Sequence, residues 1–471
     1  MARQRTLKIG ISGVRGVVGD SLTPALLVRF AQAFGTYLKG GQVAVGRDTR
    51  PSGEMVRAAV IGGLLATGCD AVDFGILPVP TLQIAVARKH LQGGVAITAS
   101  HNPQEWNALK FIWTDGVLLY PHQAEELLNI YHQGAFSLLG EDGVGQASEG
   151  TGAIEEHLAL IVEHTDVEAI RSAGLRVVVD CVNGAGSLLA PDLLRALGCR
   201  EVIVINGEPN GLFPRRPEPR PEHLQELADV VRETGADIGF AQDADADRLA
   251  LVDETGTPVS EEYTLALAAE VVASTAGPIP LVANLSTSRM IEEVGERYGC
   301  PVRRSKVGEI HVVAAMRQEA QKFRESGLTN HPAWAFGGEG NGGVIDPRIH
   351  YCRDSHRAMS LILEGLARVD KPLSEWIRTT FRPSAMAKIA TPAPVSKIQQ
   401  ILIRLRRHYS DDGHIDDTEG IKVTWPDRSW VHVRPSNTEP VVRIIAEADT
   451  KEKAEAIAAE ALEVVQAALG A

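Results

Sequence analysis

The chain has 471 residues, of which 44% are hydrophobic and 23% are charged, a balance typical of a folded protein and not of a disordered one. Asp and Glu outnumber Lys and Arg by 60 to 47, and the formal net charge of −13 argues against nucleic acid or an anionic membrane as the main partner. The length favours three or four domains, each able to bury a core of its own.

The cysteines and the N-terminus indicate a cellular compartment. No Cys-x-x-Cys pair occurs, so the sequence indicates neither a zinc site nor a disulfide framework for Cys69, Cys181, Cys199, Cys300 and Cys352. The first residues lack the apolar core of a secretion signal, and no stretch reaches the ~18 uninterrupted apolar residues of a membrane helix. We therefore expect a cytoplasmic protein with reduced cysteines that binds no membrane.

Strand-like and helix-like segments alternate through residues 1–150, as in an α/β domain. A helix is expected from Thr23-Pro24 to Tyr37, because threonine caps a helix and proline fits its first turn. Polar loops are expected at residues 12–16 and 47–53. The expected strands are residues 7–11, 42–46, 70–74 and 94–97.

Three further domains follow a Gly- and Ser-rich segment at residues 140–152, which predicts the first boundary. The pattern that resumes at residue 175 includes strand-like runs at 201–205, 238–241 and 249–252, and a third α/β pattern has strands at 281–284 and 302–305. The last part combines helices with alternating strands at 430–433 and 441–446, as in a smaller α+β domain. The predicted fold is therefore three similar α/β domains with mixed sheets and a smaller C-terminal α+β domain, with boundaries at 1–150, 151–253, 254–367 and 368–471.

A serine lies directly after the predicted strand 94–97, in Thr98-Ala99-Ser100-His101-Asn102-Pro103. Side chains just past strand ends are those that meet ligands in open α/β sheets. Pro103 disfavours helix at Asn102, so Ser100 is held on a defined loop. No Gly-x-Ser-x-Gly surrounds the serine, which excludes the nucleophile elbow of α/β hydrolases. An ordinary turn with a helix cap is the alternative.

Three carboxylates alternate in the loop between the strands 238–241 and 249–252, at Asp243, Asp245 and Asp247, and Arg248 follows them. Such carboxylates can converge on a hard cation such as Mg²⁺ or Ca²⁺. An EF-hand is disfavoured, because Arg248 stands where that loop needs glycine and strands flank the loop instead of helices. A solvated acidic loop is the alternative, although carboxylates between buried strands repel one another without a cation.

Two further loops carry ligand-binding groups. Residues 337–343 combine glycines with Glu339 and Asn341, whose side chains suit sugar hydroxyls; a flexible glycine-rich turn is the alternative. The other loop, residues 434–440 with Arg443 after it, can bind phosphate through its arginines and hydroxyls; surface charge on a hairpin turn is the alternative. Its candidate residues are Arg434, Ser436, Asn437, Thr438 and Arg443.

These loops, in this order, resemble the α-D-phosphohexomutase family over essentially the whole chain, through SGVRGVVG, GRDTRPSG, TASHNP, DADADR, GEGNGG and RPSNTEP. The resemblance implies an active site in the central cleft, where Ser100 carries a phosphoryl group. It also implies that Asp243, Asp245 and Asp247 bind Mg²⁺, with an oxygen of phosphorylated Ser100 as a further ligand.

The resemblance assigns roles to further residues. Arg15 and Arg248 match arginines near the phosphoserine and the substrate, and Lys306 matches a substrate-contacting lysine. Lys110 matches a proposed general base and His101 an active-site histidine; which of these two is the base stays open. A lysine base needs a pKa lowered toward neutrality, which a nearby Arg248 or Mg²⁺ would favour. For Lys110 and Lys306, a surface lysine is the alternative.

The implied reaction is the interconversion of hexose 6-phosphate and hexose 1-phosphate, with a phosphoserine enzyme, a 1,6-bisphosphate intermediate, and glucose or glucosamine 1,6-bisphosphate as activator. The loop from Arg434 to Arg443 would hold the phosphate that is not reacting, and closure of the fourth domain would exclude water. The enzyme class is that of isomerases, and small hexose phosphates are the partners. Monomer and homo-oligomer both remain open.

The sugar loop indicates a branch of the family. Asn341-Gly342-Gly343 replaces the Ser-Gly-His of many bacterial members, and this form resembles the archaeal-type branch with phosphoglucosamine mutase or phosphomannomutase activity. We expect phosphoglucosamine mutase first, and phosphomannomutase or phosphoglucomutase as the alternative. A non-catalytic sugar-phosphate-binding protein and a phosphatase that shares the phosphoserine are the alternatives from other classes.

Overall fold

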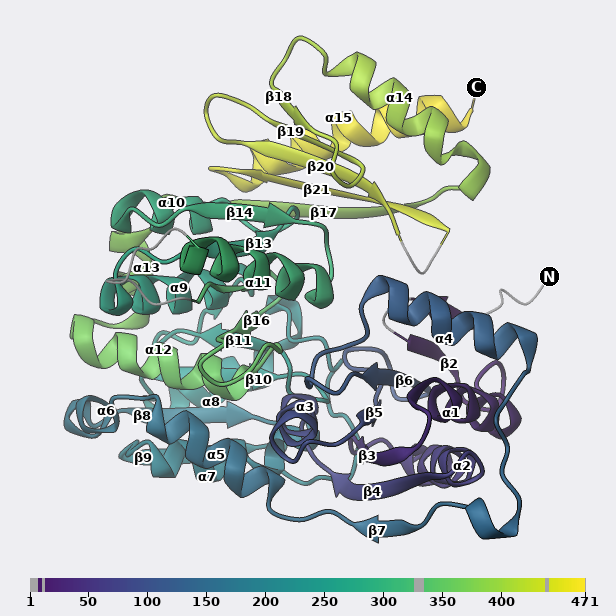
Figure 1. The fold of residues 1–471 in the computed structure, drawn as a ribbon. Helices are drawn as coiled ribbons and strands as arrows, with labels where there is room; N and C mark the ends of the chain where they lie inside the picture. The colour runs from purple at the N-terminus through teal and green to yellow at the C-terminus, as the bar shows by residue number, and fades with distance from the viewer. Residues whose placement is uncertain (1–6, 11–12, 326–333, 437–439, 471) are drawn as a thin grey trace. The chain divides into compact units, whose positions relative to one another are not determined.

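The computed structural model describes residues 7–10, 13–325, 334–436 and 440–470 (Figure 1). The chain divides into two compact units, one formed by Met1–Val272 and Asn341–Trp376 and the other by Ala273–Gly340 and Ile377–Ala471. It passes between them within α9 (Glu262–Ala276), after Gly340, and within α13 (Leu373–Thr380). Among the described residues, none of the helices has both the length and the apolar character needed to span a membrane.

The N-terminal part of the first unit contains a seven-stranded sheet in the order β1-β2-β6-β5-β3-β4-β7. The pairs from β5 through β3 and β4 to β7 are parallel, and those from β1 to β5 are antiparallel, so the sheet is mixed. The strands are β1 (Lys8–Gly10), β2 (Gly13–Val17), β3 (Gly41–Arg47), β4 (Cys69–Ile76), β5 (Gly93–Ile97), β6 (Trp106–Ile112) and β7 (Ala147–Glu149).

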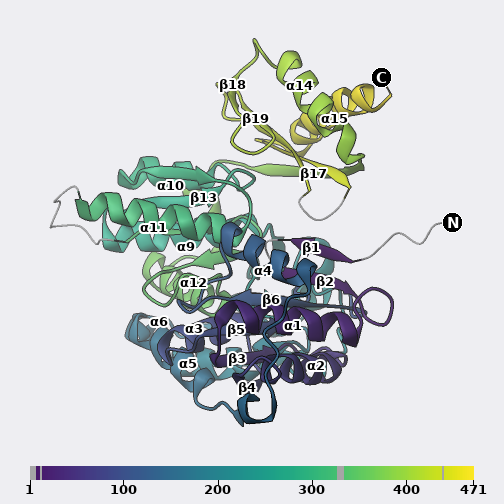
Figure 2. The ribbon, with the colours of Figure 1, turned by 45° about the vertical axis from the view of Figure 1, so that its right-hand side comes forward.

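Helices cover both faces of this sheet (Figure 2). Successive side chains of a strand point to opposite faces, so Val43 and Val45 of β3 pack in one core and Ala44 in another. The first core holds residues of α1 (Pro24–Leu38), α2 (Gly53–Leu65) and α4 (Pro121–Gln133). The second holds residues of α3 (Val79–Arg88) and the first residue of α5 (Ala153–Glu163). The Thr23 hydroxyl accepts the Leu26 N–H at 3.4 Å and caps α1, as the sequence predicts.

A second mixed sheet in this unit has the order β12-β11-β10-β8-β9. Its strand β8 is parallel to β9 and β10, whereas β10 and β11 form an antiparallel hairpin. The strands are β8 (Arg176–Asp180), β9 (Glu201–Ile205), β10 (Ile238–Gln242), β11 (Leu249–Val252) and β12 (Pro258–Val259). The turn of the hairpin carries the three aspartates, and α8 (Gln225–Thr234) packs its apolar residues against this sheet.

The remaining elements of the first unit lie outside these two sheets. They are α6 (Val167–Ala173), α7 (Ala190–Ala196), α12 (Ser355–Val369), β16 (Gly343–Ile345) and the 3₁₀ helices η1 (Glu141–Gly143), η2 (Ala185–Leu188) and η3 (Pro221–His223).

The second unit contains parallel strands in the order β14-β13-β15 and an antiparallel sheet in the order β17-β21-β20-β19-β18. The helices α14 and α15 pack on the antiparallel sheet and enclose one apolar core with it (Figure 1). The strands are β13 (Leu281–Asn284), β14 (Val302–Ser305), β15 (Phe336–Glu339), β17 (Ala385–Pro392), β18 (His414–Asp416), β19 (Ile421–Thr424), β20 (Trp430–Pro435) and β21 (Val441–Ala448). The helices are α10 (Met290–Tyr298), α11 (Glu309–Glu325), η4 (Val395–Lys397), α14 (Ile398–His408) and α15 (Lys451–Leu469).

Three segments expected as loops contain strands. The expected loop 12–16 largely forms β2, because residues 14–17 pair with β6 and their backbone groups join that ladder. The expected boundary 140–152 contains β7, which pairs with β4. The expected sugar loop 337–343 begins in β15 and ends in β16, so only residues 340–342 connect the two strands.

A buried lysine joins two elements of the second unit. Lys422 on β19 donates from Nζ to the Leu285 carbonyl at 2.7 Å and lies 4.1 Å from the centre of the Trp430 ring. Burial, followed by the nearby Arg304, lowers the pKa of Lys422 to about 7. Glu292, Glu447 and Asp416 oppose this shift but do not reverse it.

This lowered pKa predicts a pH-dependent stability. Between pH 7 and the ordinary lysine pKa of 10.5, the unfolded chain holds the Lys422 proton and the folded chain does not. The free energy of unfolding therefore rises with pH in this window, by up to about 1.4 kcal/mol per pH unit. Lys422→Met should reduce that rise in denaturant unfolding of the full chain, whereas Lys451→Met, at an exposed position, should leave it unchanged. An identical pH profile for Lys422→Met and wild type would contradict the assignment.

Candidate active site

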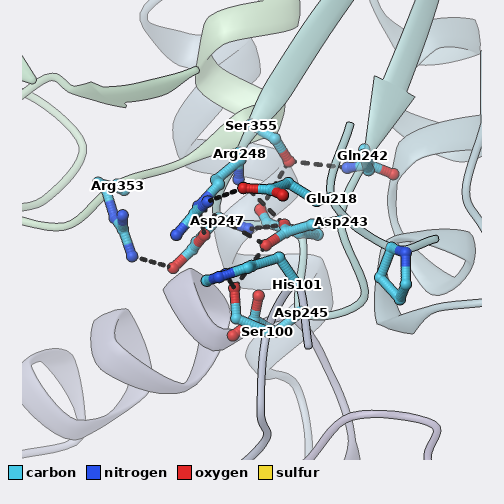
Figure 3. A network of polar contacts seen from close by, with 12 residues as sticks. Ser100, His101, Glu218, Gln242, Asp243, Asp245, Asp247, Arg248, Arg353 and Ser355 are labelled. Atoms are coloured by element: carbon cyan, nitrogen blue, oxygen red, sulfur yellow. Dashed lines mark hydrogen bonds and ion pairs between the residues drawn. The ribbon is translucent and has the colours of Figure 1, made fainter. Parts of the chain in front are cut away.

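Ser100 lies in a buried turn directly after β5, as the sequence predicts (Figure 3). Its side chain donates a hydrogen bond from Oγ to Oδ2 of Asp243 at 2.7 Å. Its φ of +48° lies in the left-handed region, which non-glycine residues adopt only when their surroundings hold them there. The structure thus brings the predicted nucleophile and the predicted acidic loop together.

The three aspartates converge in the β10–β11 turn. All three side chains are buried, and one carboxylate oxygen of each lies within 4.8 Å of the others. Two backbone N–H groups, those of Asp247 and Arg248, donate to Oδ1 of Asp243 at 3.2 Å and close the turn. Ala246 has a φ of +58°, and its carbonyl accepts a hydrogen bond from the Ser355 hydroxyl at 2.6 Å.

Cationic side chains surround this acidic cluster. Nζ of Lys110 lies 2.8 Å from Oδ2 of Asp245 and 3.5 Å from Oδ2 of Asp247. Arg353 donates to Oδ2 of Asp247 at 2.5 Å, and Nε of Arg248 lies 3.7 Å from Oδ1 of Asp247. Three cations therefore meet the charge of three buried carboxylates.

The carboxylates do not share these cations equally. Burial, together with the charges of Asp245 and Asp247, raises the pKa of Asp243 well above its usual range. Burial also favours the neutral form of Asp245, but Lys110 outweighs it and lowers the pKa of Asp245 below its usual range. Of these two aspartates, Asp243, which accepts the Ser100 hydroxyl, is thus the one whose charged form the surroundings stabilise less.

The expectation of a lowered Lys110 pKa is wrong for this structure. Burial lowers the pKa of Lys110, but the neighbouring Asp245 and Asp247 outweigh burial and raise it. Lys110 is also buried, so the alternative of a surface lysine is wrong.

His101 and Arg15 flank the serine. Nδ1 of His101 lies 3.4 Å from Oγ of Ser100. Burial, followed by Arg248 and Arg15, lowers the pKa of His101 well below its usual range, so the imidazole is neutral at pH 7. Arg15 on β2 donates to Oδ1 of Asn102 at 2.8 Å.

The acidic cluster fits a hard cation. Oδ1 of Asp245 and Oδ1 of Asp247 are buried and accept no hydrogen bond from the described residues. Buried polar atoms without a partner are uncommon in folded proteins, and carboxylate oxygens are the ligands that Mg²⁺ and Ca²⁺ prefer. The residues that would hold such an ion are Asp243, Asp245 and Asp247, with Ser100 beside them.

The second unit brings several other predicted residues together. Oε1 of Glu339 accepts hydrogen bonds from Nδ2 of Asn284 at 2.8 Å and from the Gly308 N–H at 2.9 Å. Buried Arg434 pairs with Arg443 across β20 and β21 and lies 3.6 Å from Glu419.

The other predicted residues of these loops have different positions. The charges of Lys306 and Glu339 both act on the pKa of His311, which places these groups near one another, and Lys306 is exposed. Asn341 is half-buried and belongs to the first unit, and Ser436 follows β20. Asn437 and Thr438 lie outside the described residues.

Sequence reasoning missed two charged residues of the site. Arg353 precedes the helix cap Asp354, where the sequence signals only a helix start. Glu218, in the proline-rich loop before α8, lies 3.9 Å from Nη1 of Arg248 (Figure 3). Neither residue belongs to a recognisable motif, and only the fold brings them to the aspartates.

Comparison with known proteins identifies the family. Four of its domains match the chain in order: phosphoglucomutase/phosphomannomutase alpha/beta/alpha domain I at residues 6–138, domain II at 155–256, domain III at 260–383 and the C-terminal domain at 384–464. These matches confirm the predicted fold class of three α/β domains and a different C-terminal domain.

Individual relatives agree over nearly the whole length. The chain is 40% identical over 461 residues to a protein of Methanopyrus kandleri named "Probable phosphoglucosamine mutase", and the match covers 97% of each. It is 38% identical over 456 residues to a "Phosphoglucomutase/phosphomannomutase" of Thermococcus kodakarensis, with 94% of this chain and 95% of the relative covered.

A solved structure agrees as well. A phosphoglucomutase/phosphomannomutase family protein of Burkholderia thailandensis superposes with a TM-score of 0.82 at 28% identity, with 99% of this chain and 98% of that chain covered. The named relatives are mutases, which are isomerases. The chain therefore belongs to the phosphoglucomutase/phosphomannomutase family, as its resemblance to the α-D-phosphohexomutases predicts.

Proposed function

We propose that this protein interconverts hexose 6-phosphate and hexose 1-phosphate, with Ser100 as the phosphoryl carrier and a hexose 1,6-bisphosphate as the intermediate. The contact between Oγ of Ser100 and Asp243 carries the proposal, because it places a hydroxyl against three buried carboxylates. Phosphoryl transfer needs charge neutralisation and positioning more than covalent chemistry, and the groups of this site can supply both.

Mg²⁺ is the cation we propose for Asp243, Asp245 and Asp247. When bound, it supplies positive charge to the phosphoryl oxygens. Lys110, Arg248 and Arg353 add fixed positive charge around the same acidic cluster.

The residues beside Ser100 handle its proton. His101 is neutral, and its Nδ1 lies 3.4 Å from Oγ of Ser100, so it can accept a proton there. The neighbouring Asp245 and Asp247 raise the pKa of Lys110, so its Nζ holds a proton. Lys110 could accept a proton only if bound Mg²⁺ lowered its pKa, and on that condition both residues stay candidates for the general base. Arg15 orients the loop through Asn102.

The remaining predicted residues are assigned to the rest of the substrate. We assign Glu339, with Asn341 of the first unit, to sugar hydroxyls, and Lys306 to the substrate phosphate or sugar. We assign Arg434 and Arg443, which pair across one hairpin, to the phosphate that is not reacting. The residues between them in sequence that we assign to the same phosphate are Ser436, Asn437 and Thr438.

Glucosamine phosphate is the substrate we propose first. The Methanopyrus kandleri relative, 40% identical, carries the name "Probable phosphoglucosamine mutase". The Thermococcus kodakarensis relative, 38% identical, carries the phosphoglucomutase/phosphomannomutase name, so mannose and glucose phosphates form the second candidate. Glucose or glucosamine 1,6-bisphosphate is the proposed activator, and we place the protein in the cytoplasm.

The test is an assay of purified protein with glucosamine, mannose and glucose 6-phosphates, Mg²⁺ and a 1,6-bisphosphate. The wild type should convert at least one of them to the 1-phosphate, with glucosamine 6-phosphate favoured. Intact-mass measurement should find one phosphoryl group on active wild type and none on Ser100→Ala, which should be inactive. Release of inorganic phosphate without isomerisation would identify a phosphatase, and full turnover by Ser100→Ala would exclude Ser100 as the carrier.

Loss of an aspartate charge should weaken metal binding and turnover together. A bound ion stabilises the transition state by several kcal/mol, so the kcat of Asp245→Asn should fall about a hundredfold or more. Mg²⁺ should raise the Tm of the wild type, because it binds the folded state, and raise that of Asp245→Asn much less. Asp229→Asn is the control, because Asp229 is half-buried on α8 and pairs with Arg232, outside the acidic cluster. Undiminished activity in excess chelator would contradict the proposal.

Arg434→Ala should weaken substrate binding while the fold survives. Loss of one charge-assisted phosphate contact costs roughly 1.5–3 kcal/mol, or about ten- to a hundredfold in kcat/KM, with KM raised. Arg406→Ala is the control, since Arg406 is exposed in the same unit and pairs with exposed Asp417. If Arg434→Ala and Arg443→Ala both keep wild-type kcat/KM, the phosphate binds elsewhere.

A further inference from the structure

One buried arginine organises the whole turn that carries Ser100. The guanidinium of Arg50 is fully buried, and all five of its N–H donors are used. One donor reaches a carboxylate, Oδ2 of Asp48, at 3.0 Å. The other four reach main-chain carbonyls at 2.6–3.1 Å, those of Ser100, Asn102, Pro103 and Trp106.

Asp48 binds Arg50 and is also linked, through Thr98, to the backbone N–H of Ser100. Its Oδ1 accepts the backbone N–H of Arg50 at 3.0 Å, and its Oδ2 also accepts the Thr98 hydroxyl at 2.7 Å. Oγ1 of Thr98 in turn accepts the backbone N–H of Ser100 at 2.9 Å. The N–H and the carbonyl of Ser100 are therefore both tied, through Thr98 and Arg50, to one carboxylate.

These contacts act on a residue in an unfavourable backbone conformation. The left-handed φ of Ser100, +48°, persists only where the surroundings over-determine it. The ring of Phe213 lies 5.0 Å from the Arg50 guanidinium carbon and covers the arginine. Because every donor of Arg50 is committed, its position leaves the turn little freedom to relax.

We propose that Arg50 is a positioning residue for phosphoryl transfer. It fixes the turn of residues 100–106 so that Oγ of Ser100 faces Asp243 and the metal-binding aspartates. Arg50 acts through the backbone, since its side chain meets four carbonyls of the turn and no reacting group. This inference rests on the proposed function, in which Ser100 carries the phosphoryl group.

Lysine cannot replace this arginine. Its ammonium has three donors at one point, whereas the planar guanidinium spreads five donors over a fork that reaches both the turn and Asp48. Arg50→Lys keeps the charge opposite Asp48 and loses most of the carbonyl contacts. A displacement of about 1 Å at the reacting oxygen costs on the order of a hundredfold in rate, so kcat should fall by about that factor while KM stays near wild type.

The experiment compares Arg50→Lys with Arg357→Lys. Arg357 is equally buried and pairs with Asp346 at 2.8 Å, but its hydrogen bonds go to Asp346, Thr165 and Ser360 and to no residue of the turn. Both variants lose a buried guanidinium, so both report general destabilisation. Kinetics with the hexose phosphate that wild type converts is one readout, and hydrogen–deuterium exchange over residues 98–106 is the other.

Only Arg50→Lys should lower kcat selectively and speed exchange in the turn; Arg357→Lys should keep the wild-type values of both. Equal kcat for Arg50→Lys and wild type, or equal losses for both variants, would overturn the inference. An inactive wild type would refute the proposed function instead, and the exchange data would then decide alone whether Arg50 holds the turn.

If Arg50→Lys fails to fold, Asp48→Asn, which removes the charge that orients Arg50, should give the same pattern with a smaller loss.

Discussion

Three buried carboxylates in one short turn are the constraint on which the rest of this site depends. Asp243, Asp245 and Asp247 lie between two buried strands, where their charges repel and water cannot screen them. Lys110 forms an ion pair with Asp245, and Arg353 forms one with Asp247. The pKa of Asp243 is raised, and its carboxylate accepts the Ser100 hydroxyl. A buried acidic cluster of this kind can bind a metal ion, and the Ser100 hydroxyl lies beside it.

Backbone strain accompanies this concentration of charge. Ser100 and Ala246 both adopt a left-handed φ, one in the serine turn and one in the aspartate turn. Each is held by a hydrogen-bonding side chain from elsewhere in the first unit: Arg50 binds the Ser100 carbonyl and Ser355 binds the Ala246 carbonyl. Positioning of this kind suits a reaction that depends on alignment and electrostatic stabilisation more than on reactive groups.

Local patterns predict the regular elements well and the site only in part. Runs of β-branched and other apolar residues at 201–205, 249–252 and 281–284 coincide with β9, β11 and β13. The glycine-rich segment of β2 looks like a loop, because its strand character comes from pairing with β6 and not from its own residues. The serine and aspartate loops are recognisable as motifs, but Ser100 and Asp243 are 143 residues apart in sequence. Arg353 becomes a site residue only through the fold.

The most direct measurement is a single-turnover transfer from Ser100. Wild-type protein is labelled on the serine with a radioactive 1,6-bisphosphate, freed of excess ligand, and mixed with hexose monophosphate, with and without Mg²⁺. The label should leave Ser100 and appear in hexose bisphosphate only when both sugar phosphate and Mg²⁺ are present. Label that never attaches to Ser100, or that leaves equally fast without Mg²⁺, would contradict it.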